Sequence, residues 1–220
     1  MVDAAIVHPE NQQGYFFSGR RYARIKWTSY TGSEEIVYGP TKLKDVWHAV
    51  TNAGFGRIDA AVGVQGTTDE FYFFFGASVI RIKFSPGGAD HLLEGPLKIT
   101  DKWKSLASTP FDTIDAVINL PGSSTEAYLF SGTHSVRFDL VHDRIVYGPY
   151  TLISAWPGLT SAGFETIDAA IPVPDAKVDG EHYVFKGSQY VRIQVIPGAP
   201  DKLTWGPAPI ADYWKTLDWY

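Results

Sequence analysis

The chain has 220 residues, a formal net charge of −5 and no cysteine. A chain of this length can bury a core without cross-links, and the lack of cysteine excludes disulfides, thiolate metal ligands and cysteine nucleophiles. No run of Lys or Arg offers the basic stripe that binds phosphate backbones, so we expect no nucleic-acid partner. The chain contains 7 Trp, 12 Tyr and 13 Phe, and aromatic residues suit a pleated sheet surface.

The start of the chain, residues 1–5, has no basic region and no long apolar stretch, so we expect no secretory signal. The longest apolar run, around residues 71–75, is too short to span a bilayer, and no membrane association is expected. Together with the absence of cysteine, these features favour a cytosolic protein.

An Asp-Ala-Ala tripeptide, or a near copy of it, opens each of four repeats. It occurs at residues 3–5, 59–61, 115–117 and 168–170, and the steps between the aspartates are 56, 56 and 53 residues. Self-similarity at such a period is typical of propellers and solenoids. We expect a short strand to begin at each of these tripeptides, followed by a polar loop such as residues 66–69.

Two further strands follow in each repeat. The first is aromatic and lies at residues 15–17, 73–75, 128–130 and 183–185. A short turn such as residues 131–133 is a hairpin signal, and the next strand alternates apolar and polar residues. That strand carries one arginine in each repeat, and we expect it to meet acidic groups between repeats: Arg24, Arg81, Arg137 and Arg192.

A fourth short strand, such as residues 145–147, completes each repeat. Gly-Pro pairs at residues 39–40, 95–96, 148–149 and 206–207 are expected to end its pairing, because proline has no N–H to donate. A tryptophan comes next in each repeat and is expected to be core: Trp47, Trp103, Trp156 and Trp214. Residues 99–106 have helical spacing, with Thr100 as the expected N-cap.

Four strands and one short helix per repeat predict an all-β chain folded as a four-bladed β-propeller. We expect a single domain with blades at approximately 1–54, 55–110, 111–163 and 164–220. In the first three repeats the Trp precedes the next Asp by 12 residues, whereas after Trp214 the chain stops too soon. Asp3 supplies the missing position, so the two ends are expected to close the ring.

The pattern Phe-x-x-Ile-Asp-Ala-Ala, at residues 55–61, 111–117 and 164–170, resembles the hemopexin repeat over essentially the whole chain. Four such repeats without cysteine are similar to the legume seed albumin-2 type proteins. This resemblance implies a non-enzymatic seed albumin or storage protein of the seed cytosol. It further implies an ion-bearing central channel with calcium at the aspartate ring, binding of spermine or a similar polyamine, haem binding in some members, and a homodimer.

The innermost strand of a propeller blade leaves one edge of its backbone unpaired and facing the axis. Alternate residues present their carbonyls in the same direction, which predicts two rings of four oxygens. The upper ring comes from the backbone carbonyls of Asp3, Asp59, Asp115 and Asp168, and the second from Ala5, Ala61, Val117 and Ala170. Ca²⁺ takes six to eight oxygen ligands, so four carbonyls and waters suit it. Na⁺ or an ammonium group could use the same rings, and N–H groups between them could hold Cl⁻.

Several alternatives stay open on the sequence. The aspartates could instead cap neighbouring elements, with the alanines there only for packing. His134 and His182 are the candidate haem ligands, although surface histidines would look the same. No nucleophile motif is present, so no enzyme is expected. The rivals to a channel-binding protein are an interaction module that uses the blade faces and an unrecognised hydrolase with a carboxylate at the channel mouth.

Overall fold

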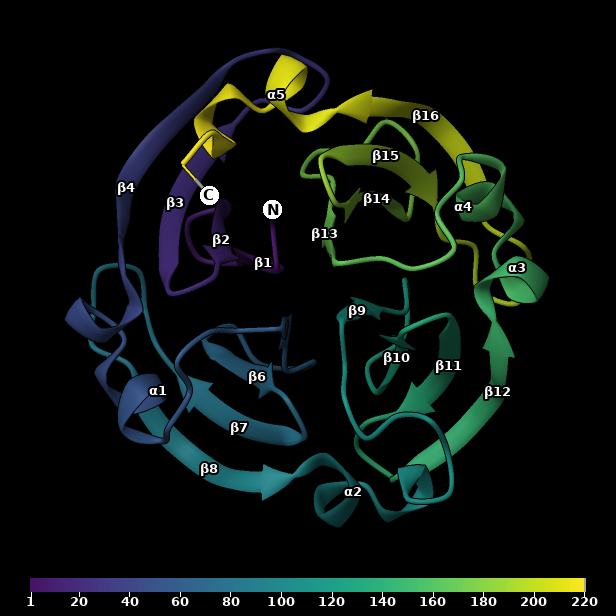
Figure 1. Cartoon of the computed structure of the whole chain (residues 1–220), viewed down its shortest axis with the longest axis horizontal. Helices are drawn as coiled ribbons and strands as arrows, with labels where there is room; N and C mark the ends of the chain where they lie inside the picture. Colours follow the sequence, from purple (N-terminus) through teal and green to yellow (C-terminus); the bar gives the residue numbers. More distant parts are fainter. Residues whose placement is uncertain (220) are drawn as a thin grey trace.

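The computed structural model describes residues 1–219 as four antiparallel sheets of four strands around a central axis (Figure 1). Each sheet contains four consecutive strands paired in sequence order. The strands of blades 1 and 2 are β1 (Ala4–His8), β2 (Gln13–Ser18), β3 (Arg21–Trp27), β4 (Glu34–Lys42), β5 (Ala60–Gly63), β6 (Glu70–Phe75), β7 (Ser78–Lys83) and β8 (His91–Lys98). Those of blades 3 and 4 are β9 (Ala116–Asn119), β10 (Glu126–Ser131), β11 (His134–Asp139), β12 (Arg144–Thr151), β13 (Ala169–Pro172), β14 (Glu181–Lys186), β15 (Gln189–Gln194) and β16 (Lys202–Pro209). The predicted four-bladed β-propeller is confirmed.

Short helical turns follow the outermost strand of each blade and lie on the rim of the ring (Figure 1). They are η1 (Leu43–Asp45) and α1 (His48–Asn52), α2 (Ile99–Lys102) and η2 (Lys104–Leu106), α3 (Leu152–Ala155) and α4 (Pro157–Ser161), and α5 (Ile210–Tyr213) and η3 (Lys215–Leu217). Residues 99–106 are thus two short turns rather than one helix. Thr100 lies inside α2, where Lys98 is the N-cap and makes no side-chain cap bond. No helix of the described chain is long and apolar enough to cross a membrane.

The apolar core lies between neighbouring blades, as four separate clusters that each draw on two sheets. The four repeated tryptophans each occupy one cluster and are 2–4% exposed, which confirms them as core: Trp47, Trp103, Trp156 and Trp214. The Gly-Pro pairs, in contrast, lie within the outermost strands, next to register shifts. The expectation that they end the strands is wrong, because each strand resumes pairing after the irregularity.

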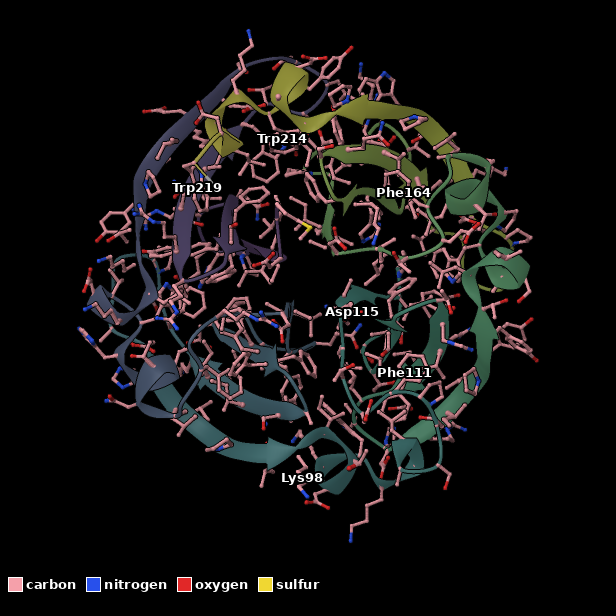
Figure 2. The ribbon with its side chains drawn as sticks, in the orientation of Figure 1. Lys98, Phe111, Asp115, Phe164, Trp214 and Trp219 are labelled. Carbon is pink, nitrogen blue, oxygen red and sulfur yellow. The ribbon has the colours of Figure 1, made fainter. Side chains whose placement is uncertain are left out.

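Blade 4 packs against blade 1 without a peptide link. Trp214 lies 5.6 Å from Phe16 and 5.4 Å from Trp27, measured between ring centroids. The backbone N–H and the hydroxyl of Thr216 both donate to Glu34 Oε2, at 3.2 and 2.6 Å. Through these contacts residues 214–217 join blade 4 to blade 1 and close the ring; Trp214 is labelled in Figure 2. Tyr220, the end of the predicted last blade, lies outside the described residues.

Candidate functional site

The four innermost strands enclose the propeller axis. β1 neighbours β5 and β13, and β9 neighbours the same two strands, so the four form a closed ring. Each of them has a single partner strand within its own blade. The other edge of each strand therefore faces the axis, as Figure 1 shows from above. The predicted ring residues lie at the start of these strands.

The carboxylates of the four ring aspartates bind hairpin turns. In each blade, Oδ2 accepts the backbone N–H of the glycine between the second and third strands, at 2.6–2.7 Å: Gly19 to Asp3, Gly76 to Asp59, Gly132 to Asp115 and Gly187 to Asp168. Each aspartate N–H also donates to the second strand of its blade. The capping alternative is thus borne out for the side chains, and it explains why an Asp and a turn Gly recur together in every repeat.

The backbone carbonyls of the same aspartates point the other way. Val64 N donates to Glu70 O at 2.8 Å in register with the β5–β6 ladder. Alternate amides face the same side, so those of Val62 and Ala60 also face β6. N–H and C=O are opposed in a trans peptide, and the carbonyls of Ala61 and Asp59 must therefore face the axis.

The other blades follow the same geometry. Leu120 N donates to Glu126 O and Val173 N to Glu181 O, each at 2.9 Å, and β1 pairs with β2 in the register of β5 with β6. Two levels of inward carbonyls result, one from Asp3, Asp59, Asp115 and Asp168 and one from Ala5, Ala61, Val117 and Ala170. Among residues 1–219, no three His, Asp or Glu side chains gather into a metal site.

The aspartate end of the channel is acidic. Of its four carboxylates, Asp59 pairs with Arg57 at 2.6 Å and Asp168 with Lys186 at 3.2 Å. Asp3 and Asp115 form no ion pair with a side chain of the described residues. Figure 2 shows Asp115 at the axial side of its blade.

Burial shapes the titration of this end. It raises the pKa of Asp3 and of Asp115, while the hydrogen bonds from Gly19 and Gly132 act in the opposite direction. Burial also lowers the pKa of the Met1 amino group, which senses the charges of Asp3 and Asp168. The four carboxylates therefore carry a net negative potential that neighbouring bases only partly offset.

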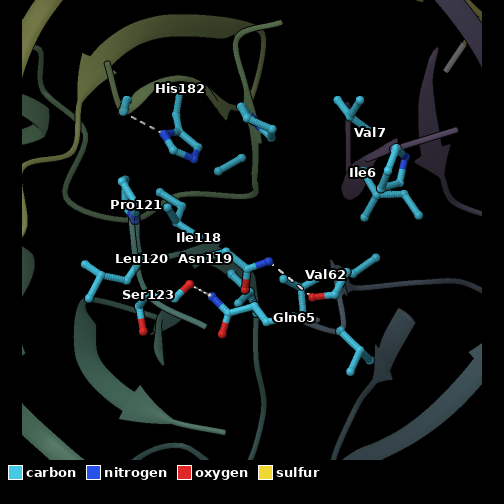
Figure 3. A pocket seen from close by; sticks show the side chains of 18 of the residues that line it. Ile6, Val7, Val62, Gln65, Ile118, Asn119, Leu120, Pro121, Ser123 and His182 are labelled. Atoms are coloured by element: carbon cyan, nitrogen blue, oxygen red, sulfur yellow. Dashed lines mark hydrogen bonds between the residues drawn. The ribbon is translucent and has the colours of Figure 1, made fainter. Parts of the chain in front are cut away.

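The opposite end of the channel opens into a basin of about 550 Å³ (Figure 3). All four second-ring residues, Ala5, Ala61, Val117 and Ala170, belong to its lining. Aliphatic side chains such as Ile118 and Leu120 form much of its wall, and the described lining contains no Lys or Arg. This wide mouth offers apolar surface and oxygen acceptors without any competing positive side chain.

Two amides bridge blades 2 and 3 at the basin wall. Gln65 Nε2 donates to the carbonyls of Ser123 and Glu126, both at 3.1 Å, and Asn119 Nδ2 donates to Gly63 O at 3.1 Å. Their amide oxygens are buried and accept no hydrogen bond from the described residues. No repeated pattern marks either residue, since Val7 and Pro172 stand where Asn119 does, and Pro9, Pro121 and Pro174 stand where Gln65 does.

The two candidate haem ligands lie at opposite ends of the propeller. His134 begins β11 beside the hairpin turn at the aspartate end, whereas His182 lies on β14 and lines the basin. They therefore cannot ligate one iron together. His182 Nδ1–H donates to Gly180 O at 2.9 Å, and burial lowers the pKa of His182 to about 4, so its Nε2 is an unprotonated acceptor.

The sheets, their closure and the ringed channel define a four-bladed β-propeller of the hemopexin type. The chain has the fold of the hemopexin-like repeat proteins and is similar to the legume albumin-2 proteins over nearly its whole length. No family model matches the chain. Albumin-2 of Pisum sativum is 28% identical to it over 98% of this chain and 94% of the relative, and albumin-2 of Lathyrus sativus is 27% identical over 98% and 95%.

Solved structures agree with the sequence relatives. An albumin from Cicer arietinum, described as showing hemagglutination, has a TM-score of 0.90 at 27% identity and covers 99% of this chain and 96% of its own. A Cicer arietinum lectin with two metal-binding sites has a TM-score of 0.91 at 26% identity, covering 100% and 99%. The hemopexin-fold protein CP4 from cow pea has a TM-score of 0.89 at 27% identity, also covering 100% and 99%.

Proposed function

We propose that this chain is a non-enzymatic seed albumin whose channel binds cations: Ca²⁺ at the aspartate end and a polyamine such as spermine through the basin. The observation that carries the proposal is the double ring of inward backbone carbonyls, eight oxygens with no ladder partner. An unpaired buried carbonyl costs free energy, and a cation on the axis would offset that cost.

Calcium suits the aspartate end because four carbonyls would bind it while the acidic side chains supply a favourable field. Hard cations prefer oxygen ligands, and Ca²⁺ tolerates flexible geometry and bound water. The carboxylates act at a distance in this proposal, since each is already engaged by a turn glycine. The Cicer arietinum lectin, a structural neighbour with two metal-binding sites, supports the proposal that this fold can bind metal ions.

A polyamine suits the basin because it is narrow, flexible and positively charged. Its methylene segments would lie against Ile118, Leu120 and their neighbours, and its ammonium groups would approach the second carbonyl ring. His182 stays neutral near pH 7 and adds no repulsion. A rigid macrocycle would not follow the chain of carbonyls along the axis.

Isothermal titration of chelator-treated protein tests both parts. We expect calcium to bind with one site per chain, and spermine to bind afterwards with undiminished affinity because it enters from the other end. Affinity should fall from spermine to a diamine of similar length, and further for the matching neutral diol. Equal binding of the diol, or full displacement of spermine by calcium, would refute the two-ended arrangement.

One observation favours sugar binding as a second function. Tyr147 and Tyr150 are 59% and 44% exposed, their ring centroids lie 4.7 Å apart, and they line a groove of about 490 Å³ between blades 3 and 4. Exposed aromatic faces attract the C–H edges of sugar rings. Red-cell agglutination that disappears in Tyr147→Ser with Tyr150→Ser, but persists in the exposed control Ile153→Ser, would support this function; agglutination by neither wild type nor control would exclude it.

A further inference from the structure

The third strand of each blade carries an arginine at an equivalent position, and three of these four arginines pair with a glutamate of their own blade. Glu70 pairs with Arg81, Glu126 with Arg137 and Glu181 with Arg192, always from the neighbouring strand. The expectation that these arginines meet acids between blades is therefore wrong, because the diagonal partner on the second strand is nearer. The spacing from Glu to Arg is 11 residues in blades 2 and 3.

The first blade breaks this pattern. The residue 11 positions before Arg24 is Gln13, which begins β2 where Glu70 begins β6. Arg24 forms no ion pair with any residue of the described range 1–219, and its buried Nε has no hydrogen-bond partner there. The guanidinium carbon lies 5.9 Å from the ring centre of Tyr15 and 5.8 Å from that of Tyr38. These rings lie beside an arginine that has no ion-pair partner among the described residues.

Arg24 lines a cavity of about 130 Å³ between blades 1 and 2. Three other residues of its lining are less than a tenth exposed and each carries a buried polar atom without a partner in the described chain: Tyr15 Oη, Trp47 Nε1 and Asp90 Oδ1. Tyr15, Arg24 and Trp47 offer donors, whereas Asp90 offers an acceptor. Leaving such buried groups without hydrogen-bond partners costs free energy.

Two of the equivalent tryptophans and the equivalent aspartate of blade 4 find partners within the protein. Trp103 Nε1 donates to Leu140 O at 3.0 Å, and Trp156 Nε1 donates to Ser135 Oγ at 2.8 Å. Both oxygens of Asp201 accept backbone amides, at 2.9 Å each, whereas only Oδ2 of Asp90 does so. In blade 2 the corresponding space holds Lys102, which lies over Tyr72. Of the eight buried side-chain polar atoms without a partner in the described chain, four belong to residues that line the groove between blades 1 and 2.

We propose that this groove binds a small carboxylate that also carries a hydrogen-bond donor, as hydroxy acids and amino acids do. The carboxylate would pair with Arg24 in the place that Glu70, Glu126 and Glu181 take in their blades, assisted by Tyr15 and Trp47. The hydroxyl or ammonium group would donate to Asp90 Oδ1. The cavity equals about four water molecules at ~30 Å³ each, which limits the ligand to a few heavy atoms.

Isothermal titration with glycolate, glycine and acetate tests the proposal. We expect glycolate or glycine to bind in the sub-millimolar range, and acetate roughly tenfold more weakly because it has no donor for Asp90. A glycolate preference over glycine identifies hydroxy acids as the ligand class, and the reverse preference identifies amino acids. Failure of all three probes to bind, or acetate binding as tightly as the better of the other two, would overturn the proposal.

The variant Gln13→Glu gives the sharpest control, since it restores the ion pair that the other three blades possess. We expect it to raise the melting temperature and to weaken binding roughly tenfold or more, as should Arg24→Gln. Lys26→Gln, an exposed change on the same strand, and Gln189→Glu, an exposed change in blade 4, match the two changes in charge and should leave binding unaltered. Unchanged affinity in Gln13→Glu would refute the site even if wild type binds. Spermine and calcium titrations of the same variants should match wild type, which separates this site from the channel.

Discussion

The two ends of the channel differ in the residues that form them and in their response to pH. The aspartate end is acidic, and each carboxylate accepts a hydrogen bond from a turn amide. The basin end is wide, largely aliphatic and without Lys or Arg among its described lining residues. The repeat explains this difference, because the aspartate end uses positions common to all four blades, whereas the basin uses loop residues that vary between them.

Their titrations run in opposite senses. Burial raises the pKa of Asp3 and Asp115, so their contribution to stability is present below the ordinary carboxyl value of 3.8 and is lost as pH rises through the raised pKa. Burial lowers the pKa of His182 from 6.5 to about 4, so its contribution is present above 6.5 and is lost as pH falls toward 4. As pH falls through the acidic range, protonation of Asp3 and Asp115 therefore adds to stability, whereas protonation of His182 reduces it.

The largest expected effect on the pH dependence of stability comes from replacing His182, the titrating residue of the basin. His182→Gln should lose the acid sensitivity that charging a buried imidazole imposes. Between about pH 7.5 and about pH 5, wild type should lose on the order of 2 kcal/mol of unfolding free energy through this residue, and the variant none of it. Urea unfolding at the two pH values measures the difference. The exposed His91→Gln serves as control. An identical pH slope in wild type and His182→Gln would show that His182 does not titrate as a buried group.

A smaller effect separates the two roles of the ring aspartates. Asp59→Asn keeps both the inward carbonyl and an acceptor for Gly76, so it should retain calcium affinity within roughly tenfold and most of the stability. Asp59→Ala keeps the carbonyl but loses the turn bond, and should cost about 1–2 kcal/mol of unfolding free energy. Titration calorimetry and thermal melting of both variants check this. Loss of calcium affinity by several hundredfold in Asp59→Asn would instead make the carboxylate a direct ligand.

The contrast between recurring and single residues also explains how much of each end can be predicted from the sequence. Residues that recur fourfold, such as Asp59 and Trp103, revealed the propeller and the ring positions, because repetition reports what every blade requires. Residues that occur once, such as Gln65, Asn119 and Gln13, carried no periodic signal. Their roles depend on which blade lies opposite or which partner is missing, and those are properties of the folded ring. The two candidate haem ligands show what the sequence alone does not predict, since residue type does not place His134 and His182 at opposite ends of the propeller.

The smallest expected effect tests whether the two ends bind independently. Thr113 is exposed two residues before Asp115, where Arg57 stands before Asp59, so Thr113→Arg should pair with Asp115 and reduce the acidic field. We expect calcium affinity to fall roughly threefold at low salt, because exposed charges interact weakly, and spermine affinity to stay unchanged.

Thr68→Lys is the matching change at the basin, where Thr68 is exposed and belongs to the lining. It should weaken spermine roughly threefold through like-charge repulsion and leave calcium unaffected. Each variant should weaken only the ligand at its own end, because the two mouths are separated by the length of the inner strands. Salt screens exposed charges over about 8 Å at physiological ionic strength. Titration of both ligands against both variants at low and physiological salt measures it. If either change weakened both ligands equally, the channel would act as one continuous cation site, and the division into two ends would have to be given up.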